Sequence, residues 1–417
     1  MDRPILACLA GTLVLRFSSG LTAAMLVYYL ADLPRHGGPT VDAFTVALLT
    51  AAFFATELVL SPILGVLSDR IGHGRLMPIG PLLGAVAVVL TAVTTDLGLL
   101  GITRLLEGAA AAASIPSILG FLAMATSHDE ALRGRVSARF EAVTVAGIGA
   151  GIAAAGAVYT VLGAAGFLLN AVIYALAFVI YRQGVPAADL LDARAHGRGG
   201  PAADASGPPP SGSSGRSSGD ARDSSPRGGA LSRYRRLLRT RGIWLLAPTW
   251  ICLNAALGLY TSQSLFQLVK ARDPRFPDQL LVGGFTPLEI SGAFVVAGLI
   301  FFAGLAYWGD RFARYRRTTI IAAGIGGGAI LAAAALALNH SGELPVIARV
   351  PMIVAGGAGL FVLAGATPAA LGLLADISEA SPDDRGAIMG MYSVFLGLGQ
   401  VGGLLLGGLA ADIAGLD

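Results

Sequence analysis

Charged residues are scarce in this chain: Asp, Glu, Lys and Arg make up 13% of its 417 residues, whereas 54% are hydrophobic. Soluble domains carry roughly 25% charged residues. Cysteine is equally sparse. Only Cys8 and Cys252 occur, far apart and both inside apolar stretches, which argues against a disulfide framework or a metal site. We interpret both thiols as inert core residues. The composition excludes an ordinary soluble domain.

Long apolar stretches fill most of the sequence, and the mean hydropathy is +0.70. About 20 apolar residues cross the hydrocarbon core of a bilayer as a helix. Stretches such as LLGAVAVVLTAVTT are apolar on every face rather than alternating, which favours helices over a β-barrel. The first stretch, residues 4–31, is too long for a signal-peptide core and is interpreted as a retained span. The sequence therefore predicts an all-α polytopic membrane protein.

The predicted spans fall into two groups separated by a polar segment. Residues 1–182 predict a bundle of six spans, near 4–31, 42–67, 77–95, 97–125, 137–160 and 164–181. Residues 183–240 are rich in Ser, Gly, Pro and Arg, which predicts a disordered linker. Residues 241–417 predict a bundle of five spans, near 243–268, 287–308, 318–338, 346–375 and 387–411. A sixth span is expected to be missing from this second bundle.

Basic residues gather at the span ends on one side of the predicted bundles. That side carries the linker arginines together with Arg70, Arg75, Arg133, Arg135, Arg182, Arg311, Arg314, Arg316, Arg317 and Arg385. The other side has little more than Arg35, Lys270, Arg272, Arg275 and Arg349. Lys and Arg are enriched in cytoplasmic loops. We therefore expect a plasma-membrane protein whose N-terminus and linker are cytoplasmic.

A charged hairpin occurs once in each half. GVLSDRIGHGR follows the second span, and AYWGDRFARYRR follows the second span of the later half. Each hairpin contains an aspartate, an arginine directly after it and a second arginine five residues further on. These residues are Asp69, Arg70 and Arg75 in the first hairpin and Asp310, Arg311 and Arg316 in the second. Pro116 and Gly120 recur as Pro368 and Gly372, and an Arg-Gly pair follows at the same offset. The two halves are copies of one unit.

These motifs resemble those of the major facilitator superfamily. Its signature between spans two and three matches Gly65, Asp69, Arg70, Gly72 and Arg75, and a second signature in span four matches RLLEG, with Arg104 and Gly108. The resemblance covers the chain apart from the linker. It implies two pseudo-symmetric bundles that move a small solute by alternating access. The span-four stretch RLLEGAAAAASIPS is similar to that of efflux members, although span five lacks the proline of the drug-and-proton antiporter motif.

The charged hairpins are candidates for a conformational latch on the cytoplasmic side. Asp69 can cap the start of a partner helix, which we place at Gly386, because helix N-termini favour anions. Gly65 lets the bundles approach closely. The full set of candidate latch residues is Gly65, Asp69, Arg70, Gly72, Arg75, Asp310, Arg311 and Arg316. The alternative is a short positive loop that only fixes the topology.

Four ionisable residues are predicted at membrane depth in the first half: Arg16, Glu57, Arg104 and Glu107. Such groups are costly there and usually functional. Arg104 and Glu107 are three residues apart and can pair on one helix face. The resemblance links Arg104 to proton coupling, and Glu57 or Glu107 could exchange a proton as an arginine moves. The alternative is a pair of static ion pairs that brace the bundle.

In the second half the polar residues predicted at membrane depth are neutral. Asn254, Gln263 and Gln267 share one face of span seven, and Gln400 lies in span eleven. They are candidate cargo contacts, with hydrogen bonding between helices as the alternative. Arg139 and Glu141 lie near the start of span five and are interpreted as surface-directed side chains.

No enzyme signature is present: the sequence has no P-loop, no histidine-rich metal cluster and no nucleophile elbow. We expect a carrier without a cofactor or metal, acting as a monomer on a small-molecule cargo and protons, in a lipid bilayer and without nucleic acid. Proton-coupled efflux is the preferred function. The alternatives are uptake of a nutrient or organic anion bound by Arg16, and an inactive or sensor remnant of a transporter.

Overall fold

The computed structural model describes residues 2–127, 129–186, 241–309, 311–312, 314–379 and 385–417. All regular secondary structure in these ranges is helical. Nine helical stretches within them are long and apolar enough to cross a membrane, and the longest of these, Leu132–Gly184, contains two long helices. The predicted all-α polytopic class is confirmed. The linker prediction falls on residues that, apart from 183–186, lie outside the described ranges.

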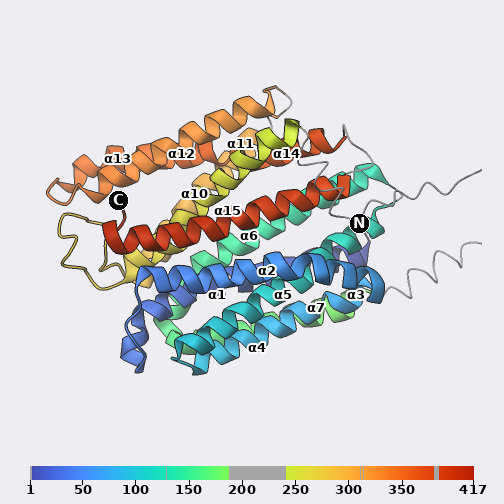
Figure 1. Cartoon of the computed structure of the whole chain (residues 1–417), viewed down its shortest axis with the longest axis horizontal. Coiled ribbons are helices and arrows are strands. Elements are labelled where there is room, and N and C mark those ends of the chain that lie inside the picture. Colours follow the sequence, from blue (N-terminus) through green and yellow to red (C-terminus); the bar gives the residue numbers. More distant parts are fainter. Residues whose placement is uncertain (1, 128, 187–240, 310, 313, 380–384) are drawn as a thin grey trace, which may run out of the picture.

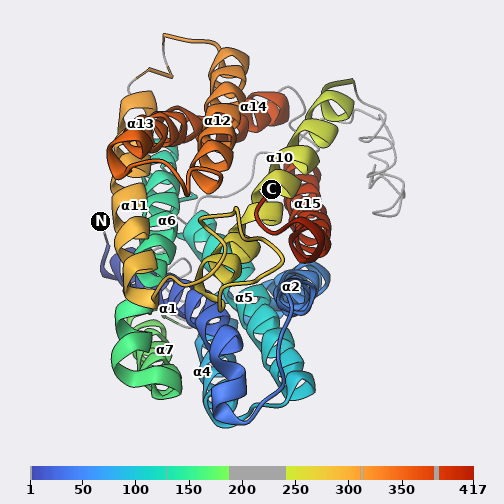
Figure 2. The same ribbon diagram turned by 90° about the vertical axis from the view of Figure 1, so that its left-hand side faces the viewer.

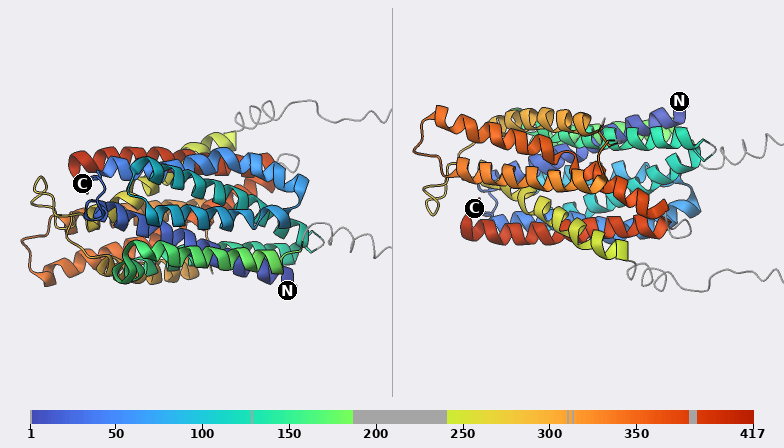
Figure 3. Two further views of the ribbon diagram at one scale, coloured as in Figure 1. Left: turned by 90° about the horizontal axis from the view of Figure 1, so that it is seen from below. Right: turned by 90° about the horizontal axis from the view of Figure 1, so that it is seen from above.

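The helices of the first half run alternately between two ends of the bundle (Figure 1). They are α1 (Arg3–Asp32), α2 (Ala43–Ile71), α4 (Ile79–Val93), α5 (Leu97–Ala125), α6 (Glu130–Leu162) and α7 (Gly166–Gly184). Short elements join some of them, namely η1 (Leu33–His36), α3 (His73–Leu76) and η2 (Gly163–Ala165). We name the ends after the termini that lie there: the N-end holds Arg3 and the C-end holds Asp417 (Figure 3).

The second half repeats this alternation. It contains α10 (Arg241–Val269), α11 (Pro287–Gly309), α12 (Arg317–Asn339), α13 (Val346–Leu363), α14 (Ala366–Glu379) and α15 (Arg385–Ala414). The break between α13 and α14 precedes Pro368, whereas the aligned Pro116 lies inside the continuous helix α5. Asp310 lies outside the described residues, between α11 and α12.

Aspartates begin several helices by satisfying N–H groups that lack an acceptor within the helix. The side chain of Asp42 accepts from Thr45 N at 2.8 Å, and that of Asp96 accepts from Leu99 N at 2.9 Å. Asp129 does the same for α6. Each of these residues follows a loop and precedes an apolar run, so local sequence sets the points where the helices start.

Helix packing follows the sequence repeat. In the first half α1 packs on α6 and α2 on α5, and in the second half α10 packs on α15 and α11 on α13. The halves meet along two equivalent seams, α2 with α15 and α6 with α11 (Figure 2). In the first half α7 covers α1 and α4; the described residues of the second half place no helix in the corresponding position against α10 and α12.

Glycines on α6 and α15 allow the closest of these contacts. A Cβ at Gly151 on α6 would overlap the Phe17 carbonyl of α1. The repeat aligns Gly151 with Gly403 on α15, where a Cβ would overlap the Ala255 carbonyl of α10. Only glycine lets the two backbones come this close. Small residues therefore form the packing face of α6 toward α1 and that of α15 toward α10.

Candidate functional site

The first half encloses a buried ion pair. Arg104 and Glu107 on α5 are 4% and 5% exposed, and Arg104 Nη1 donates a hydrogen bond to Glu107 Oε2. The spacing of three residues on one helix brings the two groups together, as the sequence predicts. Removing two charges from water is costly, and a direct hydrogen-bonded contact is what offsets that cost.

The surroundings of this pair are apolar on one side and polar on the other. The Arg104 guanidinium carbon lies 5.0 Å from the centroid of the Phe53 ring on α2, a cation–π contact. Tyr174 on α7 is buried and interacts electrostatically with both charges. Arg104 Nε and Glu107 Oε1 are buried and have no hydrogen-bond partner. The pair therefore retains one unused donor and one unused acceptor.

A second charged group surrounds Arg16 on α1, whose Cβ lies close to Gly147 of α6. The guanidinium of Arg16 acts electrostatically on two carboxylates, Glu57 on α2 and Glu141 on α6. Its Nε is buried without a hydrogen-bond partner. Two carboxyl groups from different helices thus lie within electrostatic reach of one guanidinium.

The prediction that Glu141 lies near the start of span five differs from the structure. Helix α6 begins at Glu130, so Glu141 lies about three turns into the helix. Its side chain is exposed, yet it acts on Arg16 of another helix. Sequence reasoning treated it as a surface-directed group, because a local pattern cannot reveal a partner from a distant helix.

The neutral polar residues of the second half lie between helices. Asn254 Nδ2 donates to Trp250 O on its own helix at 2.9 Å, and Gln267 Nε2 donates to Ala411 O of α15 at 3.2 Å. Gln263 is buried, and the backbone of Gln400 packs against Gly258. Gln267 thus takes the interhelical role that was the alternative to cargo contact.

The hairpin residues lie at the N-end. Asp69 has 72% of its side chain exposed and a carboxylate oxygen 3.7 Å from His73 Nε2. The His73 ring packs on Gly120 of α5, and Gly65 faces Pro116 of the same half. Gly72 adopts a positive φ of 96° that favours glycine.

The arginines of the two hairpins are mostly exposed. Arg70 and Arg75 of the first hairpin and Arg316 of the second are exposed, and the guanidinium carbon of Arg311 lies 3.5 Å from the centroid of the Tyr307 ring. The latch itself stays a prediction.

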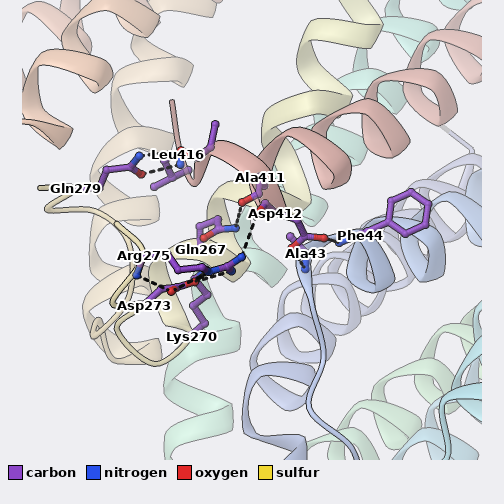
Figure 4. A network of polar contacts seen from close by, with 11 residues as sticks. Ala43, Phe44, Gln267, Lys270, Asp273, Arg275, Gln279, Ala411, Asp412 and Leu416 are labelled. Atoms are coloured by element: carbon purple, nitrogen blue, oxygen red, sulfur yellow. Dashed lines mark hydrogen bonds and ion pairs between the residues drawn. The ribbon is translucent and has the colours of Figure 1, made fainter. Parts of the chain in front are cut away.

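The polar contacts across the halves that the described side chains make lie at the opposite end. The Asp412 carboxylate of α15 accepts hydrogen bonds from the first backbone N–H groups of α2 (Figure 4). On the other seam Gly156 N of α6 donates to Ser291 Oγ of α11 at 2.8 Å. The described residues thus hold the two halves together at the C-end, while the charged hairpin of the first half is solvent-exposed at the N-end.

Comparison with known proteins agrees with this architecture. The family model of the Major Facilitator Superfamily matches residues 8–361, and the chain belongs to that family. It is thus an integral membrane protein of a transporter family. Among curated relatives, the quinolone resistance protein NorA of Staphylococcus aureus is 28% identical over 132 residues. That match covers 31% of this chain and spans about a third (32%) of the relative's length.

Solved structures share the fold over nearly the whole chain. The nucleoside transporter NupG superposes with a TM-score of 0.64 at 13% identity, covering 99% of this chain and 92% of the other. Its D323A mutant gives a TM-score of 0.65 at 13% identity, with coverage of 98% and 91%. At this identity the likeness concerns the fold alone.

Proposed function

We propose that this transporter exports a small solute in exchange for protons, by alternating access of the cavity between its two halves. The observation that carries the proposal is the concentration of ionisable groups within the first half. A carboxylate at membrane depth can give up its arginine partner and take a proton instead, and this links proton binding to the relative position of two helices. The similarity to NorA favours efflux.

Each charged group has a distinct part in this proposal. Glu107 exchanges its proton while Arg104 pairs with it or withdraws. Glu57 and Glu141 share Arg16, so a cargo that carries positive charge can displace the guanidinium from one of them. In this proposal the N-terminus is cytoplasmic and the membrane is the plasma membrane, so the exposed hairpin of the first half at the N-end supports an inward-facing state.

Uptake of an organic anion is the second candidate. It would use Arg16 as the anion-binding group, but two carboxylates act on that guanidinium and disfavour a further anion. An electrically neutral nutrient such as a nucleoside remains compatible with the fold. A sensor without transport activity is the third candidate.

Flux measurements in proteoliposomes separate these functions. We expect a pH gradient to drive uptake of a quinolone or a cationic dye into vesicles that contain the protein. We expect Glu107→Gln to abolish this driven uptake but to retain exchange of labelled for unlabelled cargo without a gradient. Flux of a nucleoside that is independent of pH supports the uptake carrier. No flux of any of these compounds supports the sensor.

A further inference from the structure

The end of α15 caps a helix that belongs to the other half. Asp412 Oδ1 accepts from Ala43 N at 2.9 Å, and Asp412 Oδ2 accepts from Phe44 N at 2.9 Å (Figure 4). These N–H groups open α2 and have no acceptor within it, and the helix dipole places partial positive charge there. A single carboxylate therefore satisfies two donors 369 and 368 residues away in sequence.

Helix α2 already has a cap of its own. Asp42 accepts from Thr45 N at 2.8 Å. The equivalent seam helix, α11, is capped entirely from its own chain segment: Thr286 N donates to Glu289 Oε2 at 2.9 Å, and Glu289 N donates to Thr286 Oγ1 at 3.3 Å. This is a capping box. The bond from Asp412 thus adds a connection between halves to a helix that has a local cap.

Neighbouring contacts fix the position of the carboxylate. Gly408, one turn before Asp412, lies so close to α2 that a Cβ would overlap Ala47 Cβ. On the other flank Arg275 Nη1 donates to Asp412 O at 3.3 Å, and Gln267 Nε2 donates to Ala411 O at 3.2 Å. The last turns of α15 are held by α2 on one side and by α10 and the following loop on the other.

The second seam lacks a carboxylate at the matching place. The repeat aligns Gly408 with Gly156, and both glycines lie against the seam helix of the opposite half. It aligns Asp412 with Thr160, whose hydroxyl donates to Gly156 O of its own helix at 2.7 Å. The two seams therefore share their glycine contact and differ in the charged cap.

We propose that Asp412 is the positioning residue that holds the C-end of the bundle closed during the transport cycle. The proposal rests on the proposed function, because it assumes alternating access. When the halves separate at the C-end, Asp412 leaves the α2 N-terminus and both groups become hydrated. Charge-assisted bonds of this kind are strong enough to favour one end state and weak enough to be released.

Distances between spin labels test the proposal directly. Cysteines replace Val93 and Val346, which are 74% and 75% exposed at the C-end of opposite halves, and Cys252→Ala removes the exposed native thiol. Pulsed EPR then compares the parent protein with Asp412→Asn and Asp42→Asn. We expect Asp412→Asn to raise the ratio of separated to closed populations about tenfold. Asp42→Asn, which removes the charge of a cap within one half, is expected to leave that ratio unchanged.

Two further variants keep the result decisive. Asp412→Ser also removes the charge and serves if Asp412→Asn does not fold. Gly408→Ala pushes the same seam apart and is expected to populate the separated state with Asp412 intact. An unchanged distance distribution in both Asp412 variants, or an equal shift in Asp42→Asn, overturns the proposal. No cargo is needed, so absence of proton-driven flux would count against the proposed function and not against this inference.

Discussion

The two halves share one helical repeat but differ in the chemistry at membrane depth. Gly20 of α1 packs on Ile148, and Gly258 of α10 packs on the aligned Gln400. One turn before each glycine stand Arg16 and Asn254, so a charged residue in the first half corresponds to a neutral one in the second. At these aligned positions the first half carries an ionisable side chain and the second half a neutral one.

The position of Glu107 shows the same difference. The repeat aligns it with Gly359 of α13, where a Cβ would approach the Gly327 carbonyl of α12 and the backbone N of Leu331. In the second half this point is a close backbone contact between two helices. In the first half the side chain of Glu107 occupies it and pairs with Arg104. At this position the first half has a buried ion pair where the second half has a close contact between helix backbones.

The largest expected effect comes from leaving a buried charge unpaired. Glu107→Met removes the partner of Arg104, which cannot lose its charge, and we expect the free energy of unfolding to fall by about 3–5 kcal/mol. Thermal unfolding in detergent with the parent protein as reference measures this. Gln267→Met in the second half removes one neutral hydrogen bond and is expected to cost about 1 kcal/mol.

The double variant Arg104→Met, Glu107→Met sharpens the test. Replacing both charges by apolar side chains is expected to restore most of the stability, because no unpaired charge remains. It should still lack flux driven by a pH gradient. A double variant as unstable as Glu107→Met alone would show that the pair contributes packing rather than charge compensation.

The features that follow from local sequence could be predicted, and those that join distant segments could not. The span composition, the repeat and the pairing of Arg104 with Glu107 depend on short spacings. The capping of α2 by Asp412 depends on how two helices from different halves meet, and no pattern near either residue signals it. Exposure is also a three-dimensional property: Cys8 is buried as predicted, but the prediction of a buried Cys252 is wrong.

A smaller effect should be equal in both halves, because the glycine contacts obey the repeat. Gly151→Ala and Gly403→Ala each place a methyl group against the backbone of a neighbouring helix, and we expect each to cost about 1–3 kcal/mol. Thermal unfolding again provides the measurement. Gly402→Ala is the control, since a Cβ there meets no atom within 4 Å. It should be neutral or slightly stabilising; a loss as large as that of Gly403→Ala would refute the packing explanation.

The smallest effect concerns the loops at the C-end, outside the spans. Asp273, 14% exposed in the loop after α10, accepts hydrogen bonds from the side chain and backbone of Arg275 and from Lys270. These partners hold the pKa of Asp273 well below its usual range. We expect Asp273→Asn to lower stability at neutral pH by at most about 1 kcal/mol, because Arg275 is largely exposed.

The pH dependence of that difference has a defined sign. The carboxylate is charged in the folded state at pH values where the unfolded chain, with a pKa of about 3.9, already binds a proton. Its contribution is therefore complete above about pH 5 and is lost as the pH falls further. Unfolding of the parent and Asp273→Asn proteins between about pH 7 and pH 2.5 should show two curves that converge on the acidic side. Asp32→Asn is the matched control in the first half, since its partner Arg35 is 84% exposed. Curves that stay parallel throughout would mean that the loop depends on packing around Asp273 and not on its charge.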